Sequence, residues 1–207
     1  MSDALVSFAS TILQAALGDA VRRVMRERSQ QASDILLDEL RTGNRSPDEL
    51  ARDDALAAMT WKYFLAMSHG AAATNLRILA RIIAHKAERA DRSADEFIMW
   101  ADLIAGLQPE ELQFLAILTQ VFTEFGLNAD NGLGHEPAQR EFLRRVVGAS
   151  AALSDNRDVQ GVGNRLIGLD LVQPLALIDG GNRFVPSRRL ERLVVMARLS
   201  AFGPEFQ

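Results

Sequence analysis

LALIDGGNRFVPS, residues 175–187, has the pattern of a β-hairpin in a chain whose other segments are mostly typical of helices. The runs LALI and RFV flank Asp179-Gly180-Gly181-Asn182, and Asp-Gly or Gly-Gly allows the positive φ angles of a tight turn. The preceding LDLVQP alternates apolar and polar residues, which predicts a short strand that Pro174 confines to an edge or an end. The register stays open, because Gly180-Gly181 or a longer loop can form the turn.

Amphipathic helices are expected on both sides of this hairpin. Asp155 and Ser187 suit the caps of two of them, and Gly168 suits a stop before the strand. The inward positions expected in the three helices are Phe142, Leu143, Val146 and Val147 in the first, Val159, Val162 and Leu166 in the second, and Leu190, Leu193, Val194 and Ala197 in the third. The order is therefore helix, helix, hairpin, helix.

With a further helix from Pro109 in front, this order resembles the winged helix-turn-helix superfamily. The resemblance covers about residues 108–199 and includes the text RLIGLDLVQP followed by NRFVPS. It implies that the hairpin is the wing and that RDVQGVGNRLIG is the recognition helix. Gly161 and Gly163 depart from a good helix sequence, since each costs roughly 1 kcal/mol relative to Ala. The helix is therefore distorted or partly unwound, or Gly161 permits close approach to a backbone or another helix.

A recognition helix here would carry polar side chains suited to DNA. Arg157, Gln160 and Asn164 stand at i, i+3 and i+7, opposite the inward stripe, where Arg suits guanine and Gln or Asn suits adenine. Arginines near the wing and in the last helix suit phosphate or the minor groove. The nucleic-acid-binding residues expected are Arg157, Gln160, Asn164, Arg165, Arg183, Arg188, Arg189 and Arg192. The alternative is that these residues only face water.

Charge is distributed unevenly along the chain. The net charge is −4, yet residues 137–200 hold ten arginines and six acids, while residues 1–136 hold 13 basic and 20 acidic residues. This asymmetry points to the C-terminal third as the part that meets a polyanion. The absence of cysteine excludes disulfides and fits a reducing compartment, so a cytoplasmic location is expected.

The N-terminal part predicts a helical bundle. Residues 4–40 form one long helix or two separated near Gly18, and the next helix runs from Pro47 to about Met67 with Ser46 as its cap and Glu49 in a capping box. Later helices are expected to end near Ala90, to run from a cap at Ser93 to Ile104, and to run from Pro109 to Gly126. The apolar N-terminal run is too short for a membrane span and has no basic residue before it, so neither a span nor a signal peptide is expected.

The chain is expected to be mainly α, with a helical domain at residues 1–107 that dimerises or binds a partner and a winged-helix-like domain at residues 108–207. Residues 126–137, GLNADNGLGHEP, form a linker or a packed loop between helices. The aromatic cluster around WKYFLAM is expected to be core rather than a ligand pocket.

No catalytic motif is present. The three histidines are far apart, and no GxGxxG, GxxxxGK[ST] or GxSxG motif occurs, so no metal or cofactor is expected. The acid pairs Asp53-Asp54 and Glu110-Glu111 suit first-turn or solvent positions.

Two functions are therefore expected, with the first preferred over the second, and neither of them is enzymatic. The first is a regulatory protein that dimerises through its N-terminal helices and binds double-stranded DNA. The second is a protein-interaction module in which the winged domain is structural and its arginines meet an acidic partner, residues 1–136 of the same chain included.

Overall fold

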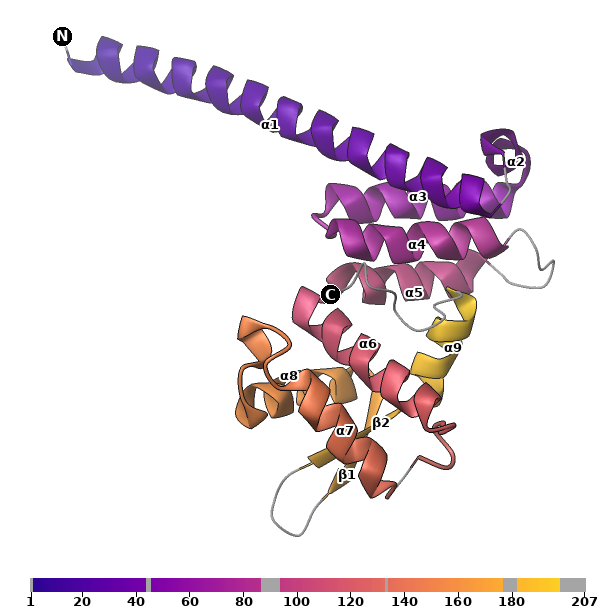
Figure 1. Cartoon of the computed structure of the whole chain (residues 1–207). Helices are drawn as coiled ribbons and strands as arrows, with labels where there is room; N and C mark the ends of the chain where they lie inside the picture. The colour runs from indigo at the N-terminus through magenta and orange to yellow at the C-terminus, as the bar shows by residue number, and fades with distance from the viewer. Residues whose placement is uncertain (1, 44–45, 87–93, 133, 177–181, 198–207) are drawn as a thin grey trace. The chain divides into compact units, whose positions relative to one another are not determined.

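The chain is mainly helical, with one small antiparallel hairpin in its described part, as the sequence predicted. The computed structural model describes residues 2–43, 46–86, 94–132, 134–176 and 182–197 (Figure 1). Its elements are α1 (Ser2–Thr42), α2 (Pro47–Arg52), α3 (Asp54–Ser68), α4 (Ala73–Lys86), α5 (Ala94–Gly106), α6 (Pro109–Glu124), α7 (Glu136–Val146), the short 3-10 helix η1 (Ala151–Leu153), α8 (Asn156–Gly168), β1 (Val172–Ala176), β2 (Asn182–Pro186) and α9 (Arg188–Met196).

The chain forms two compact units, one of Met1–Ala84 with Ser93–Ala101 and the other of His85–Arg92 with Asp102–Gln207. The predicted domain boundary between residues 107 and 108 stays a prediction. No described helix combines the length and the apolar character needed to cross a membrane.

In the first unit, α1 is one continuous helix, and Gly18 lies inside it. Its C-terminal half packs antiparallel to α3: the Tyr63 hydroxyl donates to the Ala32 carbonyl at 2.7 Å, and Arg28 donates to the Ala71 carbonyl at 2.9 Å. Because Ala71 already lies beyond the end of α3, the part of α1 before Arg28 extends past that helix (Figure 1).

The expectation of one helix from Pro47 to Met67 is wrong. Asp53 interrupts it, and the Asp53 carboxylate accepts hydrogen bonds from the backbone N–H groups of Ala55 at 2.8 Å and Leu56 at 3.2 Å, so that α3 begins with its own cap. Ser46 occupies the N-cap position of α2, but its side chain makes no cap hydrogen bond. The predicted helix end near Ala90 and cap at Ser93 lie outside the described residues.

A buried carboxylate joins α1 to α4 in this unit. Glu39 is 6% exposed, and its Oε1 lies 3.1 Å from Arg81 Nε and 3.9 Å from Arg77 Nε. Burial raises the pKa of Glu39, and the two guanidinium groups oppose that rise. Of the aromatic cluster, Tyr63 is fully buried as expected for core, whereas Trp61 is 66% exposed.

Three phenylalanine rings form the centre of the second unit. Phe114 of α6 lies edge-to-face with Phe142 of α7 and with Phe184 of β2, with ring centroids 5.0 and 5.2 Å apart. All three are fully buried. The cluster therefore fixes the hairpin against the two helices that precede α8.

The hairpin begins later than the sequence predicted. Pairing runs from Val172 opposite Pro186 to Ala176 opposite Asn182, so Leu169 does not belong to the strand. Pro174 lies opposite Phe184, whose backbone bonds instead to the buried side chain of Gln139: Gln139 Nε2 donates to the Phe184 carbonyl at 2.8 Å, and the Phe184 N–H donates to Gln139 Oε1 at 3.2 Å. The side chain of Gln139 thus hydrogen-bonds to the edge of β2 that faces away from β1, as a third strand would. The predicted turn residues 179–181 lie outside the described residues.

α8 ends at Gly168, as the sequence predicted, and the left-handed residue that follows its cap is Asp170 rather than a glycine. Asp170 has a φ of 56°, and its N–H donates to the Ile167 carbonyl at 2.9 Å while the Leu171 N–H donates to the Leu166 carbonyl at 3.0 Å. This pair of bonds is a Schellman motif, which requires a left-handed residue at the position after the cap. The Ser187 hydroxyl donates to the Asp170 carbonyl at 2.6 Å, which ties the start of α9 to this corner.

The segment between α6 and α7 is a packed loop where it is described. A Cβ on Gly132 would lie 2.5 Å from Phe122 Cε1 and 2.8 Å from the Asn128 carbonyl oxygen, so the loop backbone lies directly against α6. The Ala129 N–H donates to Glu191 Oε1 at 2.5 Å. These contacts favour the packed-loop alternative over a linker.

Candidate nucleic-acid interface

The first turn of α8 is capped by carboxylates. Asp155 accepts hydrogen bonds from the N–H groups of Arg157 at 2.7 Å and Asp158 at 3.0 Å, as the sequence predicted for a cap. These backbone bonds hold the pKa of Asp155 below its usual value. The Ser154 hydroxyl donates to Asp158 Oδ2 at 2.6 Å, so two acids lie at the positive end of the helix dipole.

Gly163 allows α8 to lie directly on the hairpin. A Cβ at Gly163 would overlap Cε1 and Cζ of the Phe184 ring, and Gly163 itself is buried. The fully buried positions of α8 are therefore Val159, Gly163 and Leu166, and Val162, also predicted to face inward, is half-buried. The expected distortion is also absent, since α8 is a continuous helix of 13 residues.

The outer face of α8 carries the three side chains predicted to read bases. Arg157 and Asn164 are exposed, and Gln160 is half-buried. Gly161 lies between them on the exposed side, and a Cβ there would meet nothing within 4 Å. Arg157, Gln160 and Asn164 thus share one helix face, and Gly161, which has no side chain, lies among them.

Arg165 has a structural partner. Its Nε lies 3.1 Å from Oε1 of Glu111, a charge contact without the alignment of a hydrogen bond. Glu111 is fully buried, and its Oε2 accepts the Gln108 N–H at 2.8 Å in a capping box. Of the two predicted alternatives for Glu111, the first-turn charge is confirmed, and the solvent-exposed charge is excluded by its burial. The guanidinium of Arg165 lies against this buried carboxylate.

The three arginines of α9 that were predicted to contact phosphate do not lie on the outer face of α8. Figure 1 shows α8 and α9 on opposite sides of α6. Arg188 Nη2 lies 2.7 Å from Asp130 Oδ1, and Arg189 Nη1 donates to the Leu169 carbonyl at 3.1 Å. Arg192 is exposed.

Arg183 of β2 is half-buried and lies opposite Leu175 in the ladder. Because side chains alternate along a strand, Arg183 and Phe184 lie on opposite faces of the hairpin. The eight predicted residues therefore do not gather on one surface: Arg157, Gln160 and Asn164 share a face, and the other five are distributed over the hairpin, α9 and a contact with α6.

Two arginines of α7 are also engaged within the unit. Arg145 Nη2 lies 2.7 Å from Glu124 Oε2, and both Arg144 Nη2 and Arg145 Nε lie 2.6 Å from Glu141 Oε1. Hydrogen bonds from Arg144 and then Arg145 lower the pKa of Glu141 to about 2. Much of the positive charge counted in the sequence is thus offset by acids on neighbouring turns.

The sequence contained signals for contacts that we did not predict. Gly163 is at i+4 from Val159 and i−3 from Leu166, which is an inward position, and Gln139 precedes Phe142 by one turn on the buried face of α7. A glycine or an amide at an inward position marks a close approach or a buried hydrogen bond. His135, considered only as a metal ligand, caps α7 by accepting the Ala138 N–H at its Nδ1, at 3.3 Å.

Comparisons of the chain with protein-family models, with curated proteins and with solved structures found no match. In the part of the chain that the structure describes, no three His, Asp or Glu side chains come together in a group that could hold a metal ion.

Proposed function

We propose that the second unit is a winged helix-turn-helix module that binds double-stranded DNA, with α8 as the recognition helix and the β1–β2 hairpin as the wing. The observation that carries this proposal is the seating of α8: Gly163 packs against Phe184 of the hairpin, while Arg157, Gln160 and Asn164 lie on the outward side. A helix held on its inner face by the hairpin is free to enter a major groove with its outer face.

The order of elements supports the same proposal. α6 and α7 precede α8, and both share the phenylalanine cluster with β2, on whose Phe184 α8 packs through Gly163. The hairpin follows α8 after the three residues 169–171, with the corner at Asp170. In this arrangement α7 and α8 form the helix-turn-helix, and Gln139 replaces the third strand that would otherwise pair with β2.

The first test is fluorescence anisotropy of the full-length protein with a labelled mixed-sequence duplex at salt concentrations from about 50 to 200 mM, the range over which phosphate contacts lose most of their affinity. We expect micromolar binding at low salt that falls steeply as salt rises, because bound arginines displace condensed counterions. No binding at the lowest salt would refute the proposal.

Variants then locate the contact. Arg157→Ala should weaken binding to a selected site by roughly tenfold or more, the value of one bidentate contact to a base. Arg192→Ala removes the same charge from α9 and is the matched control, because α9 lies on the other side of α6. Equal losses in the two variants would assign binding to the general field of the unit rather than to α8.

We further propose that the regulator is a dimer joined through the N-terminal part of α1. Val21, Val24 and Met25 are 60%, 48% and 37% exposed on the part of α1 that precedes the contact of Arg28 with Ala71. Their spacing of three and four residues forms one apolar stripe, and such a stripe on the part of α1 that extends past α3 favours a partner helix. Light scattering should give twice the chain mass, and Val24→Asp should give a monomer; a monomeric parent protein would refute this part.

The acids of the second unit favour the alternative of a protein-interaction module. Asp155 and Asp158 occupy the start of α8, where a helix dipole would otherwise attract a phosphate. If the anisotropy test shows no binding, the outer face of α8 becomes the surface to test against protein partners.

A further inference from the structure

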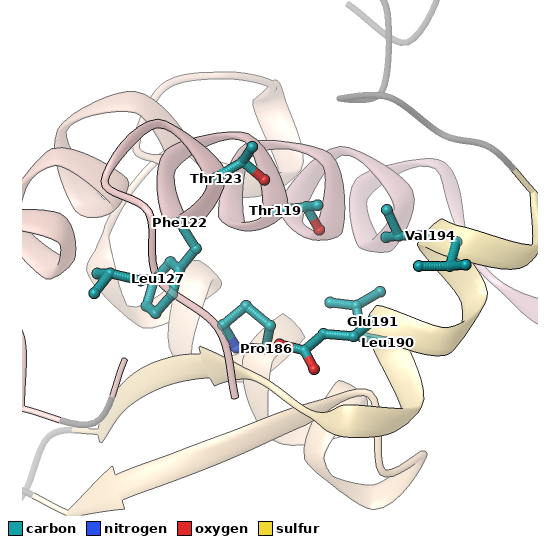
Figure 2. Close-up of a pocket in the computed structure, with 9 residues that line it drawn as sticks. Thr119, Phe122, Thr123, Leu127, Pro186, Leu190, Glu191 and Val194 are labelled. Atoms are coloured by element: carbon teal, nitrogen blue, oxygen red, sulfur yellow. The ribbon is translucent and has the colours of Figure 1, made fainter. Parts of the chain in front are cut away.

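A partly open groove lies between α6 and α9, on the side of α6 that α9 covers. Its walls are mostly apolar, and the volume between them is about 170 Å³ (Figure 2). The apolar side chains that line it include Phe122, Leu127, Pro186, Leu190 and Val194. A cavity of about 150 Å³ in another protein is large enough to bind benzene, so this space suits a single aromatic ring or a short aliphatic chain.

Thr119 places an unsatisfied polar atom in this groove. Thr119 is 8% exposed, and its Oγ1 has no hydrogen-bond partner among the residues that the structure describes. A threonine in a helix commonly bonds to the carbonyl one turn earlier, whereas Figure 2 shows this hydroxyl on the side of α6 that faces the groove, where neighbouring side chains cover it. Because burying a hydroxyl without a partner is costly, the atom marks a position at which a ligand would supply a hydrogen bond.

Glu191 supplies a negative charge at the opposite wall. Its carboxylate lies beside Pro186, across the space from Thr119 (Figure 2). The Glu191 Oε1 accepts the Ala129 N–H, which fixes the carboxylate at the edge of the groove. A carboxylate in such an apolar setting favours a cation and repels an anion.

We propose that this groove binds a small primary amine in its protonated form, with the apolar body between Phe122, Leu190 and Val194 and the ammonium group between Thr119 Oγ1 and Glu191. An ammonium group has three donors and no acceptor, which matches one hydroxyl oxygen and one carboxylate. A hydrocarbon would leave Thr119 unpaired, and a carboxylic acid would lie against Glu191 with like charge.

The test is NMR of the full-length protein with methyl and amide labels, titrated with benzylamine. Three probes with the same ring serve as controls: benzyl alcohol, toluene and benzoate. We expect benzylamine to shift the methyl signals of Leu127, Leu190 and Val194 with a dissociation constant on the order of 1 mM, ordinary for so small a ligand. Benzyl alcohol should bind less tightly, and benzoate should not bind.

Two variants assign the polar contacts. Thr119→Val keeps the shape and removes the hydroxyl, and Glu191→Gln removes the charge while its amide oxygen still accepts from Ala129. Each should weaken benzylamine about tenfold, the effect of losing one hydrogen bond between a charged and a polar group. Thr123→Val makes the same chemical change one turn later at the exposed rim of the groove and should leave the affinity unchanged.

Several results would overturn the proposal. The first is that toluene or benzoate binds as tightly as benzylamine. The second is that Thr119→Val and Glu191→Gln leave the benzylamine-induced shifts unaltered. The third is that no site-specific shift occurs with benzylamine up to about 10 mM, tenfold above the expected dissociation constant. Binding that occurs only after removal of residues 201–207 would identify the C-terminal segment of this chain as the natural occupant and would also overturn it. Since no DNA is present, these results are independent of the proposed DNA binding.

Discussion

Replacing Gly163 by alanine should destabilise the second unit, whereas the same replacement at Gly161 should stabilise it. Both glycines lie in α8, two residues apart, and alanine is the better helix former at each. The difference is their surroundings: a Cβ at Gly161 meets nothing within 4 Å, and a Cβ at Gly163 overlaps the Phe184 ring.

The expected magnitudes follow from two opposing effects. Helix propensity favours alanine over glycine by about 1 kcal/mol at either position. At Gly163 the added methyl group must also displace packed atoms, which costs about 1–3 kcal/mol. The Phe184 ring is fully buried and lies 5.2 Å from Phe114, so it cannot turn aside. We therefore expect the free energy of unfolding to rise by about 1 kcal/mol for Gly161→Ala and to fall by about 1 kcal/mol for Gly163→Ala.

Urea unfolding followed by circular dichroism measures both changes on the full-length protein. The double variant Gly163→Ala with Phe184→Leu makes room for the methyl group, so its loss should be smaller than the sum of the two single losses. If Gly163→Ala stabilises the protein as much as Gly161→Ala does, α8 is not seated on Phe184 and the account of the candidate interface is wrong.

Three further predictions test other contacts. Gln139→Leu should lower the free energy of unfolding by about 1–3 kcal/mol, because it leaves the buried N–H and carbonyl of Phe184 without partners, and thermal unfolding checks this loss. Asp170→Gly should stabilise the protein by about 0.5–1 kcal/mol, since glycine adopts the φ of 56° without strain; a lower Tm would contradict the assigned Schellman corner. The pKa of Glu141 is lowered from 4.5 to about 2 in the folded protein, so the carboxylate stabilises the fold fully above pH 4.5 and this stabilisation is lost as the pH falls toward 2. The decline in Tm between pH 4.5 and 2 should therefore be shallower in Glu141→Gln.

Local sequence rules predicted the elements of the second unit well. The starts of α8 and α9 follow from Asp155 and Ser187, whose side chains accept hydrogen bonds from backbone N–H groups in the first turn. The start of α6 follows from Pro109, which has no N–H group that would need a partner there. The hairpin was predicted from its alternation and its turn residues, although its register was left open, and the observed strands pair residues 172–176 with residues 182–186. These signals act within a few residues and can be identified in one sequence.

Contacts between distant residues were not predictable in the same way. The Asp53 break depends on which of two adjacent acids caps a helix, and the Glu111–Arg165 contact joins positions 54 residues apart. Gly163 was assigned a helix-breaking effect because propensity was considered without Phe184, whose packing outweighs the cost of glycine. The shared helix face of Arg157, Gln160 and Asn164 could therefore be predicted from periodicity, whereas contacts with other elements, such as those of Arg165 and Arg188, could not. That any of these residues binds nucleic acid stays a prediction.

The positive charge of the second unit supports DNA binding less strongly in the structure than the count of arginines in the sequence suggested. Arg144 and Arg145 share Glu141, Arg188 pairs with Asp130, and Arg165 neutralises a buried carboxylate. Phosphate binding by any of these arginines would have to compete with a carboxylate already in place, so the salt dependence of DNA binding should report fewer contacts than the ten arginines between residues 137 and 200. Sequence preference would then come from the outer face of α8 rather than from net charge, which is why a base-reading variant and a charge-matched variant on α9 separate the two proposals for this unit.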